Sequence, residues 1–411
     1  MPRSPIAGRA TRALRRAVPS VVALVVAVAA IATVTVPAEA GYRPRVVIVV
    51  GPSGSATHDY LSHARAYARL ARARGASVAT IYTPNATWSR VVKAAQGANI
   101  FIYLGHGNGW PSPYRPWQTR TKDGLGLNPS LGSGNMRVKY YGEAAVAASI
   151  RLAPGAIVLL NRLCYASGSA EPGMAQPKWR TAVRRVDNYA AGFLHTGAAA
   201  VIADGHTSLA YELPALFGPD QLVTRLWTRD PDANGHVRSF NSRRIGTVRT
   251  HLYPDQAGTG FYRSLALRPG ARSGAIRIAA LSGTVTQRAV LRAAPDTGRV
   301  LATIPHGQRV FVRGVPREGA AGRTWTPITT RRGQAGWIAG WLLAYDGTAL
   351  TRKQMTVRAA PSLDGARRGV VKEGRRVQVL RSRVDSAERV WLKVTTPRGR
   401  TGWIAGWHTQ P

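Results

Sequence analysis

The sequence has a single cysteine, Cys164, among 411 residues. One cysteine cannot form a disulfide within its own chain, so packing must supply the stability. Acidic residues are also scarce, with 19 Asp and Glu against 57 Lys and Arg, and the net charge is +38. Such an excess favours anionic surroundings. The arginines are spread along the chain and no nucleic-acid motif is present, so the expected partners are cell-wall polymers or lipid headgroups rather than nucleic acid.

Long apolar runs are also rare in the sequence, and the one that matters for localisation lies near its start. The segment 1–40 combines several arginines with an apolar run from Val21 to Val36, followed by Ala38-Glu39-Ala40. This order is typical of a secretory signal that is cleaved before Gly41. The alternative is an uncleaved membrane anchor, although the run is short and weakly hydrophobic for a span. We expect an exported protein, in which a lone thiol is reactive, intermolecular or simply buried.

Strand and helix patterns alternate after the signal, and we expect one α/β domain over residues 41–268. Apolar strands are predicted at 45–50, 77–83, 100–104, 156–160 and 198–204, and helices at 59–74, 87–96, 143–152 and 186–197. Strands that are apolar throughout indicate a mostly parallel sheet with helices on both faces. The C-terminal part of this domain shows no clear pattern. Residues 269–283, which contain most of the segment RPGARSGA, are a predicted linker.

The remainder of the chain contains a repeat. VLRAAP (290–295) returns as TVRAAP (356–361), and GWIAGW (336–341) returns at 402–407 with the same spacing. Short alternating strands with Gly-rich turns predict two all-β barrels, at residues 284–347 and 350–411.

The pattern of the two repeats resembles the bacterial SH3-like (SH3b) domain. That family commonly docks catalytic domains to peptidoglycan or other envelope ligands, so the resemblance implies a tether to an anionic envelope polymer. Four tryptophans are candidates for envelope binding: Trp337, Trp341, Trp403 and Trp407. Aromatic residues in small barrels are more often core than groove, and we favour the core interpretation.

Two of the predicted strands lead directly to residues whose side chains can take part in catalysis. The strand at 100–104 leads to His106 and Gly107, and the strand at 156–160 leads to Cys164. In an open parallel sheet, side chains at the carboxyl ends of the strands converge on one crevice. We therefore expect His106 and Cys164 to share a site.

This arrangement resembles the caspase–legumain–gingipain group of cysteine peptidases, and YLGHGNGW is most similar to the gingipain branch. The resemblance implies that Cys164 is the nucleophile and that His106 protonates the leaving amine. It also implies that the backbone amides of Gly107 and Cys164 bind the oxyanion. A thiol becomes an effective nucleophile only with a lowered pKa or a nearby base, and backbone donors stabilise the developing charge.

The sequence departs from this group around the cysteine. Leu163 stands where relatives often have alanine, and the nearest following glycine is Gly168. An inactive member, with a glycine-rich turn and a core thiol, is therefore an open alternative. A cysteine followed by His195 or His206 would match the order of NlpC/P60 wall peptidases. However, the Asp-Cys-Ser-Gly pattern of those enzymes is absent.

Other candidate site residues follow from their place near strand ends. Asp204 or Glu171 could provide a carboxylate for a basic substrate side chain. His206 follows the last predicted strand and could line the crevice, and Trp110 lies in a loop that could form its wall. No residue spacing typical of a metal site or a phosphate loop is present, so neither a metal nor a cofactor is expected.

These observations together predict an exported cysteine peptidase that hydrolyses peptide or amide bonds and is tethered to the envelope by SH3b domains. One alternative is a catalytically inactive envelope-binding protein, and another is a peptidoglycan amidase or peptidase. The sequence leaves the natural substrate and the oligomeric state open.

Overall fold

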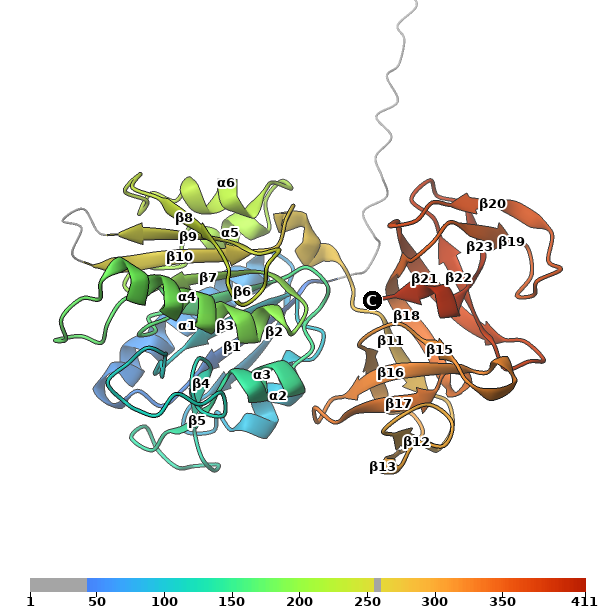
Figure 1. Ribbon diagram of the computed structural model, residues 1–411, viewed down its shortest axis with the longest axis horizontal. Coiled ribbons are helices and arrows are strands. Elements are labelled where there is room, and N and C mark those ends of the chain that lie inside the picture. The colour runs from blue at the N-terminus through green and yellow to red at the C-terminus, as the bar shows by residue number, and fades with distance from the viewer. Residues whose placement is uncertain (1–42, 255–259) are drawn as a thin grey trace, which may run out of the picture. The chain divides into compact units, whose positions relative to one another are not determined.

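The computed structural model describes residues 43–254 and 260–411 (Figure 1). The predicted signal, residues 1–40, lies outside the described residues. Within the described part of the chain, no helix combines the length and the apolar character needed to cross a bilayer.

An eight-stranded sheet forms the centre of the α/β region, with the strand order β2-β1-β3-β6-β7-β10-β9-β8. The first five strands are parallel: β1 (Arg45–Val50), β2 (Ser77–Tyr82), β3 (Ile100–Leu104), β6 (Ala156–Asn161) and β7 (Ala198–Asp204). All five were predicted from their apolar composition. β1, β3, β6 and β7 are almost entirely buried, as expected for strands covered on both faces.

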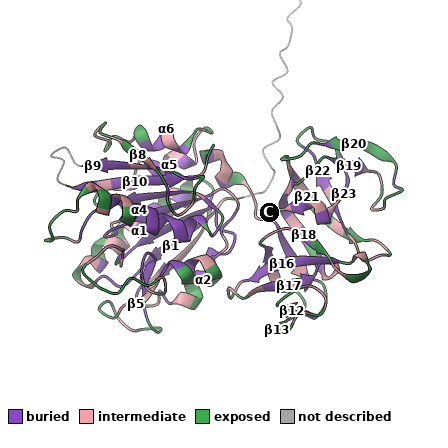
Figure 2. Cartoon of the chain, viewed as in Figure 1, coloured by how far each residue is buried: buried purple, intermediate pink, exposed green. Residues whose placement is uncertain are grey.

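Helices cover both faces of this sheet (Figures 1 and 2). They are α1 (Thr57–Ala73), α2 (Trp88–Ala95), α3 (Glu143–Ser149), α4 (Trp179–Leu194), α5 (Glu212–Leu216) and α6 (Val223–Thr228). Because side chains alternate along a strand, Val47 and Val49 pack with α2, α3 and α4, whereas Val46 and Ile48 pack with α1, α5 and α6. The predicted fold class is confirmed.

The part of this region without a clear sequence pattern forms the far edge of the sheet. β8 (Arg238–Asn241), β9 (Arg249–Pro254) and β10 (Phe261–Leu267) are antiparallel and extend the sheet from β7. A separate two-stranded sheet pairs β4 (Leu125–Leu127) with β5 (Lys139–Tyr141). It lies in the long loop region after His106 and therefore helps to shape the surroundings of that residue.

The rest of the chain is antiparallel β structure with short 3-10 turns. The first repeat contains β11 (Ser282–Val285), β12 (Ala289–Arg292), β13 (Val300–Ile304), β14 (Arg309–Val312), β15 (Arg317–Glu318), β16 (Thr324–Thr330) and β17 (Ala335–Ala339). The second contains β19 (Met355–Arg358), β20 (Arg367–Val371), β21 (Arg376–Val384), β22 (Val390–Thr395), β23 (Thr401–Ala405) and β24 (Thr409–Gln410).

One strand belongs to both repeats. β18 (Leu343–Thr351) pairs with β11 through its first half and with β21 through its second half. The boundary expected between residues 347 and 350 therefore falls inside a continuous strand. The segment expected to be a linker, residues 269–283, contains a short 3-10 helix (Ser273–Arg277) and the start of β11.

Candidate active site

The ends of β3 and β6 place the two candidate catalytic residues at one edge of the sheet. The two strands are parallel neighbours, and Leu104 is in register with Asn161. His106 lies shortly beyond the end of β3, and Cys164 lies shortly beyond the end of β6. Both line a single cavity of about 620 Å³. The structure therefore brings together a thiol and an imidazole that lie far apart in the sequence.

Gly107 allows the two loops to approach closely. A Cβ atom on Gly107 would lie 2.1 Å from the carbonyl oxygen of Cys164, so a larger residue would force the loops apart. His106 is exposed and Cys164 is half-buried. Within the described residues, no hydrogen bond joins the His106 ring to the Cys164 sulfur. Among the described residues, the backbone N–H groups of Gly107 and Cys164 donate to no other backbone group.

The turn that carries Cys164 has an unusual backbone. Arg162 and Tyr165 flank the cysteine with φ angles of 56° and 71°, in the left-handed region that bulky residues rarely adopt. Each such residue costs on the order of 1–3 kcal/mol and persists only where its surroundings hold it. The Arg162 N–H donates to the Asp204 carbonyl at 2.7 Å, and the Arg185 guanidinium lies 4.7 Å from the centre of the buried Tyr165 ring. Backbone strain of this kind is concentrated at functional sites.

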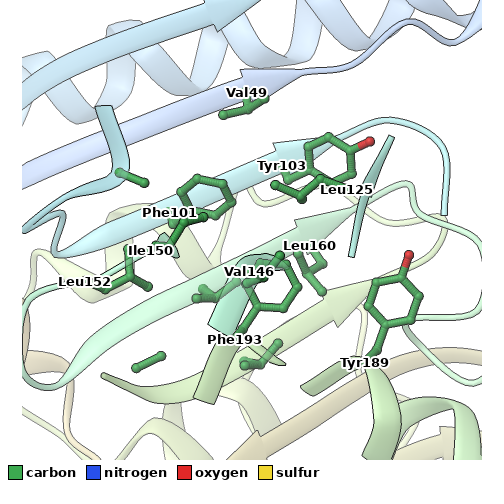
Figure 3. Packing of buried hydrophobic residues seen from close by; sticks show 14 of the residues in the cluster. Val49, Phe101, Tyr103, Leu125, Val146, Ile150, Leu152, Leu160, Tyr189 and Phe193 are labelled. Carbon is green, nitrogen blue, oxygen red and sulfur yellow. The ribbon is translucent and has the colours of Figure 1, made fainter. Parts of the chain in front are cut away.

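Two buried tyrosines of the apolar core, Tyr103 and Tyr189 (Figure 3), contact the loop that carries His106. The Tyr103 hydroxyl lies 2.8 Å from the Gly126 carbonyl oxygen and 3.1 Å from that of His106. The Tyr189 hydroxyl accepts from the Asn108 N–H at 3.1 Å and donates to the Gly124 carbonyl at 3.2 Å. Both rings belong to the apolar core on the α4 side of the sheet. The sequence analysis missed both residues, because a tyrosine in an apolar segment gives no sign of which loop its hydroxyl reaches.

The electrostatics of the cavity favour the neutral forms of both candidate residues. Burial, reinforced by the Glu171 carboxylate, raises the pKa of the Cys164 thiol to about 11. Although His106 retains an exposed surface, the protein around its ring removes part of its hydration and so lowers its pKa, while the Glu171 charge acts in the opposite direction. At neutral pH the resting pair is therefore a thiol and an uncharged imidazole. In this state the imidazole can accept the thiol proton as the sulfur reacts.

Glu171 is the carboxylate that lines the cavity. Its two oxygens accept hydrogen bonds from the hydroxyls of Tyr114, at 3.0 Å, and of Tyr165. Lys122 also lines the cavity, and its ammonium donates to Asn108 at 2.7 Å. Of the two carboxylates that the sequence suggested for a substrate pocket, Glu171 is the one that reaches the cavity.

The prediction that Asp204 lines this pocket is wrong. Asp204 shares the strand parity of Ala200 and Ile202, which face α1, α5 and α6 on the other side of the sheet. Its side chain is fully buried and pairs with Arg263 at 2.8 Å. The pleat at the end of β7 thus turns this carboxylate away from Cys164.

His206 and Trp110 are also absent from the cavity lining. His206 is exposed in the loop after β7. Trp110 is half-buried, and its backbone N–H donates to Asp123 at 2.9 Å while its carbonyl accepts from Asn188 at 3.0 Å. The Asp123 carboxylate therefore fixes the backbone of this loop at Trp110, a contact that the sequence analysis did not anticipate.

The tryptophans of the repeats are mainly structural. Trp403 and Trp407 are only 5% and 8% exposed, and Trp407 packs edge-to-face on Trp391 at 5.3 Å. These two side chains have almost no surface for a ligand, so the binding role considered for them is corrected to a core role. Trp337 and Trp341 in the first repeat are half-buried and retain some exposed surface.

Among the described residues, no group of three or more His, Cys, Asp or Glu side chains is arranged so that it could hold a metal ion.

Comparison with known proteins identifies one domain. Residues 353–410 match the bacterial SH3 domain family, which confirms the SH3-like prediction for the second repeat. No curated protein matches the chain.

Three solved structures illustrate the wider similarities. NlpC2 from Trichomonas vaginalis shares 16% identity with a TM-score of 0.15, over 32% of this chain and 48% of that one. The structure of Ly7917 shares 17% identity with a TM-score of 0.13, over 29% and 56%. The Arg specific cysteine proteinase gingipain R shares 11% identity with a TM-score of 0.29, over 89% and 67%. The chain spans about half the length of the first two.

Proposed function

We propose that this chain is an exported cysteine peptidase of the caspase–gingipain type that acts at the cell envelope. The observation that carries the proposal is the shared cavity of Cys164 and His106 at the carboxyl ends of neighbouring parallel strands. The strained turn around Cys164 and the close approach of Gly107 support the same assignment.

The proposed reaction begins with attack of the Cys164 sulfur on the carbonyl carbon of a peptide or amide bond. The thiol proton passes to the neutral His106 imidazole as the sulfur–carbon bond forms. The backbone N–H groups of Gly107 and Cys164 donate to the oxyanion. The carbon–nitrogen bond then breaks, His106 returns its proton to the leaving amine, and a thioester remains.

Water completes the reaction. His106 takes a proton from a water molecule that attacks the thioester carbonyl, and the carbon–sulfur bond breaks to release a carboxylic acid and the free thiol. Because the pKa of Cys164 is raised, the sulfur regains a proton readily at this step. The resting enzyme then returns to its neutral pair.

The attachment to the envelope rests on the C-terminal region. A bacterial SH3 domain at residues 353–410 and a net charge of +38 both favour a ligand in an anionic cell wall. Export through the predicted signal at residues 1–40 would deliver the enzyme to that compartment.

A peptidyl reagent with a thiol-reactive group tests the catalytic assignment. We expect covalent capture at Cys164, identified by mass spectrometry, that is abolished in Cys164→Ser and strongly slowed in His106→Gln. Circular dichroism of both variants shows whether they retain the fold. Absence of capture in folded wild-type protein would favour the inactive envelope-binding alternative.

A substrate comparison addresses the third candidate, a peptidoglycan hydrolase. Purified cell wall and an unfolded protein are incubated separately with the wild type and with Cys164→Ser. Cys164-dependent release of peptides from the unfolded protein supports the proposed peptidase. Cys164-dependent release of wall fragments alone would favour the peptidoglycan amidase or peptidase.

A further inference from the structure

The second repeat contains a groove whose lining is strongly basic. Its volume is about 410 Å³, and five of its lining residues are Arg368, Lys372, Arg375, Arg398 and Arg400. No acidic residue lines it. The cations come from three chain segments, namely β20, the turn before β21, and the turn between β22 and β23. Folding therefore gathers charges that lie well apart in the sequence.

These cations are not neutralised by the protein itself. All five residues are exposed, and among the described residues none of their side chains takes part in an ion pair. Glu373 follows Lys372 directly but is exposed outside the groove lining. Like charges held close together repel one another, and a bound anion with several charges relieves that repulsion. The groove is thus prepared for an anionic ligand.

The first repeat shows that the charge is a local feature rather than a result of overall composition. The pairing of β19 with β20 matches that of β12 with β13, and the pairing of β22 with β23 matches that of β16 with β17. Together with the sequence repeat of HGQRVFV as EGRRVQV, these pairings align the two repeats. The first repeat has Leu301, Pro305, Gln308, Arg332 and Gln334 at the positions equivalent to the five basic residues. Only one of the five charges is therefore shared, although the backbone framework is the same.

We propose that this groove binds a linear envelope polymer that carries repeated phosphate groups. Arginine presents a planar fork of donors that matches phosphate oxygens in a bidentate manner. Five cations spread over three segments exceed what a single phosphate can contact, so successive phosphates of one polymer fit better. Val370, which is 44% exposed, adds an apolar surface for the carbon chain between phosphates.

The inference deepens the proposed envelope attachment by naming the chemistry of its ligand, but it does not depend on the peptidase step. Long-chain inorganic polyphosphate is the probe, and its binding to the full-length chain is measured by calorimetry in the Cys164→Ser background. A triple variant, Arg368→Gln with Arg398→Gln and Arg400→Gln, removes three groove charges. We expect about tenfold weaker binding, because each exposed charge contact contributes modestly.

A matched control removes three exposed arginines outside the groove, through Arg288→Gln, Arg299→Gln and Arg383→Gln. This control has the same net charge as the groove variant, and we expect its affinity to fall less than about twofold. Equal losses in the two variants would overturn the proposal, because binding would then follow net charge alone. Tryptophan fluorescence spectra identical to that of the wild type establish that both variants are folded.

Two further ligands separate the polymer from other anions. Vesicles of phosphatidylglycerol and phosphatidylcholine, or duplex DNA, are tested with the same variants. Groove-dependent binding of either one, without binding of polyphosphate, would overturn the polymer proposal in favour of a membrane or a nucleic acid. Failure of peptidyl capture at Cys164 would refute the proposed peptidase while leaving this result unaffected, so the two proposals fail in distinguishable ways.

Discussion

Two neighbouring strands in the α/β region lead to ionisable groups in opposite environments, one accessible from a cavity and one fully buried. β6 leads to Cys164 in an open cavity, whereas β7 ends at Asp204 in a sealed cluster. Asn161 and Asp204 are in register on these adjacent parallel strands, so the two groups start from the same edge of the sheet. The side of the pleat and the available partners, rather than position at a strand end, decide whether a residue can meet a substrate.

The sealed cluster is built around one buried cation. The Arg263 guanidinium contacts Asp204 at 2.8 Å, Glu212 at 2.6 Å and Asp230 at 3.1 Å, and all four side chains are at most 2% exposed. Burial, followed by the Asp204 charge, raises the pKa of Glu212 to about 10. Glu212 therefore retains a proton at neutral pH, which reduces the excess of negative charge. The cavity avoids buried charge differently, by keeping Cys164 and His106 neutral.

The largest expected effect tests the claim that the cluster is structural. Arg263→Met should lower the free energy of unfolding by about 3–5 kcal/mol, because it leaves two buried aspartates and the protonated Glu212 without their cationic partner. Denaturant unfolding of the full chain measures the change. Arg272→Met is the matched control, since Arg272 pairs with Asp220 at 2.6 Å but both are about half exposed. That surface pair should contribute less than about 1 kcal/mol. Equal effects of the two substitutions would contradict the comparison.

The second prediction concerns the uncharged thiol of the cavity. The rate of alkylation of Cys164 by iodoacetamide should rise about tenfold per pH unit from pH 7 to pH 10, because the thiolate reacts and the pKa is raised to about 11. The single cysteine makes the reaction site-specific. A short cysteine peptide serves as the control and should level off near pH 9. A plateau below pH 8 in the protein would instead indicate a preformed thiolate–imidazolium pair.

The strands and the shared location of His106 and Cys164 were largely predictable from the sequence, and the reasons are physical. β1, β3 and β7 have the predicted bounds, because each is a short, largely apolar run that is followed directly by a glycine. The parallel-sheet rule then brought His106 and Cys164 to one edge. β8, in contrast, is a short polar edge strand with mostly exposed residues, and its sequence carries no periodic signal.

The errors at the site have equally specific causes. Asp204 could have been assigned correctly from its even spacing with Ala200 and Ile202, which places all three on one face. The roles of Tyr103 and Tyr189 depend on loop contacts 23 and 81 residues away in the chain, which no local pattern records. Sequence reasoning therefore placed the thiol and the imidazole in one site but did not identify the residues that hold their loops.

The third prediction uses the proton held by the cluster. Glu212 binds a proton in the folded state up to about pH 10 and loses it near its ordinary pKa of 4.5 when the chain unfolds. The folded state thus binds more protons, so stability should fall as pH rises from 6 to 9, by at most about 1.4 kcal/mol per pH unit. Glu212→Gln should reduce this slope, as measured by denaturant unfolding at several pH values. Glu318→Gln, at an exposed site, controls for the loss of one acidic residue. An unchanged slope in Glu212→Gln would show that other groups govern the pH dependence.

The smallest expected effect compares two buried tyrosine hydroxyls on opposite faces of the sheet. Tyr189 holds the loop of His106, whereas Tyr67 accepts from the Leu209 N–H at 3.1 Å and donates to Asn161 at 3.0 Å on the sealed side. Tyr189→Phe and Tyr67→Phe should each cost about 1 kcal/mol of stability, since each leaves buried backbone or amide groups without a partner.

Only Tyr189→Phe should also slow peptidyl capture at Cys164, by several-fold, because its hydroxyl fixes Asn108 and Gly124 beside the cavity. The rate of capture is measured by quenching the reaction at fixed times and determining the fraction of labelled protein by mass spectrometry. Equal slowing in Tyr67→Phe would mean that capture follows global stability. In that case the two faces of the sheet would not be functionally distinct, because a loss of rigidity on either face would slow the reaction of the Cys164 thiol.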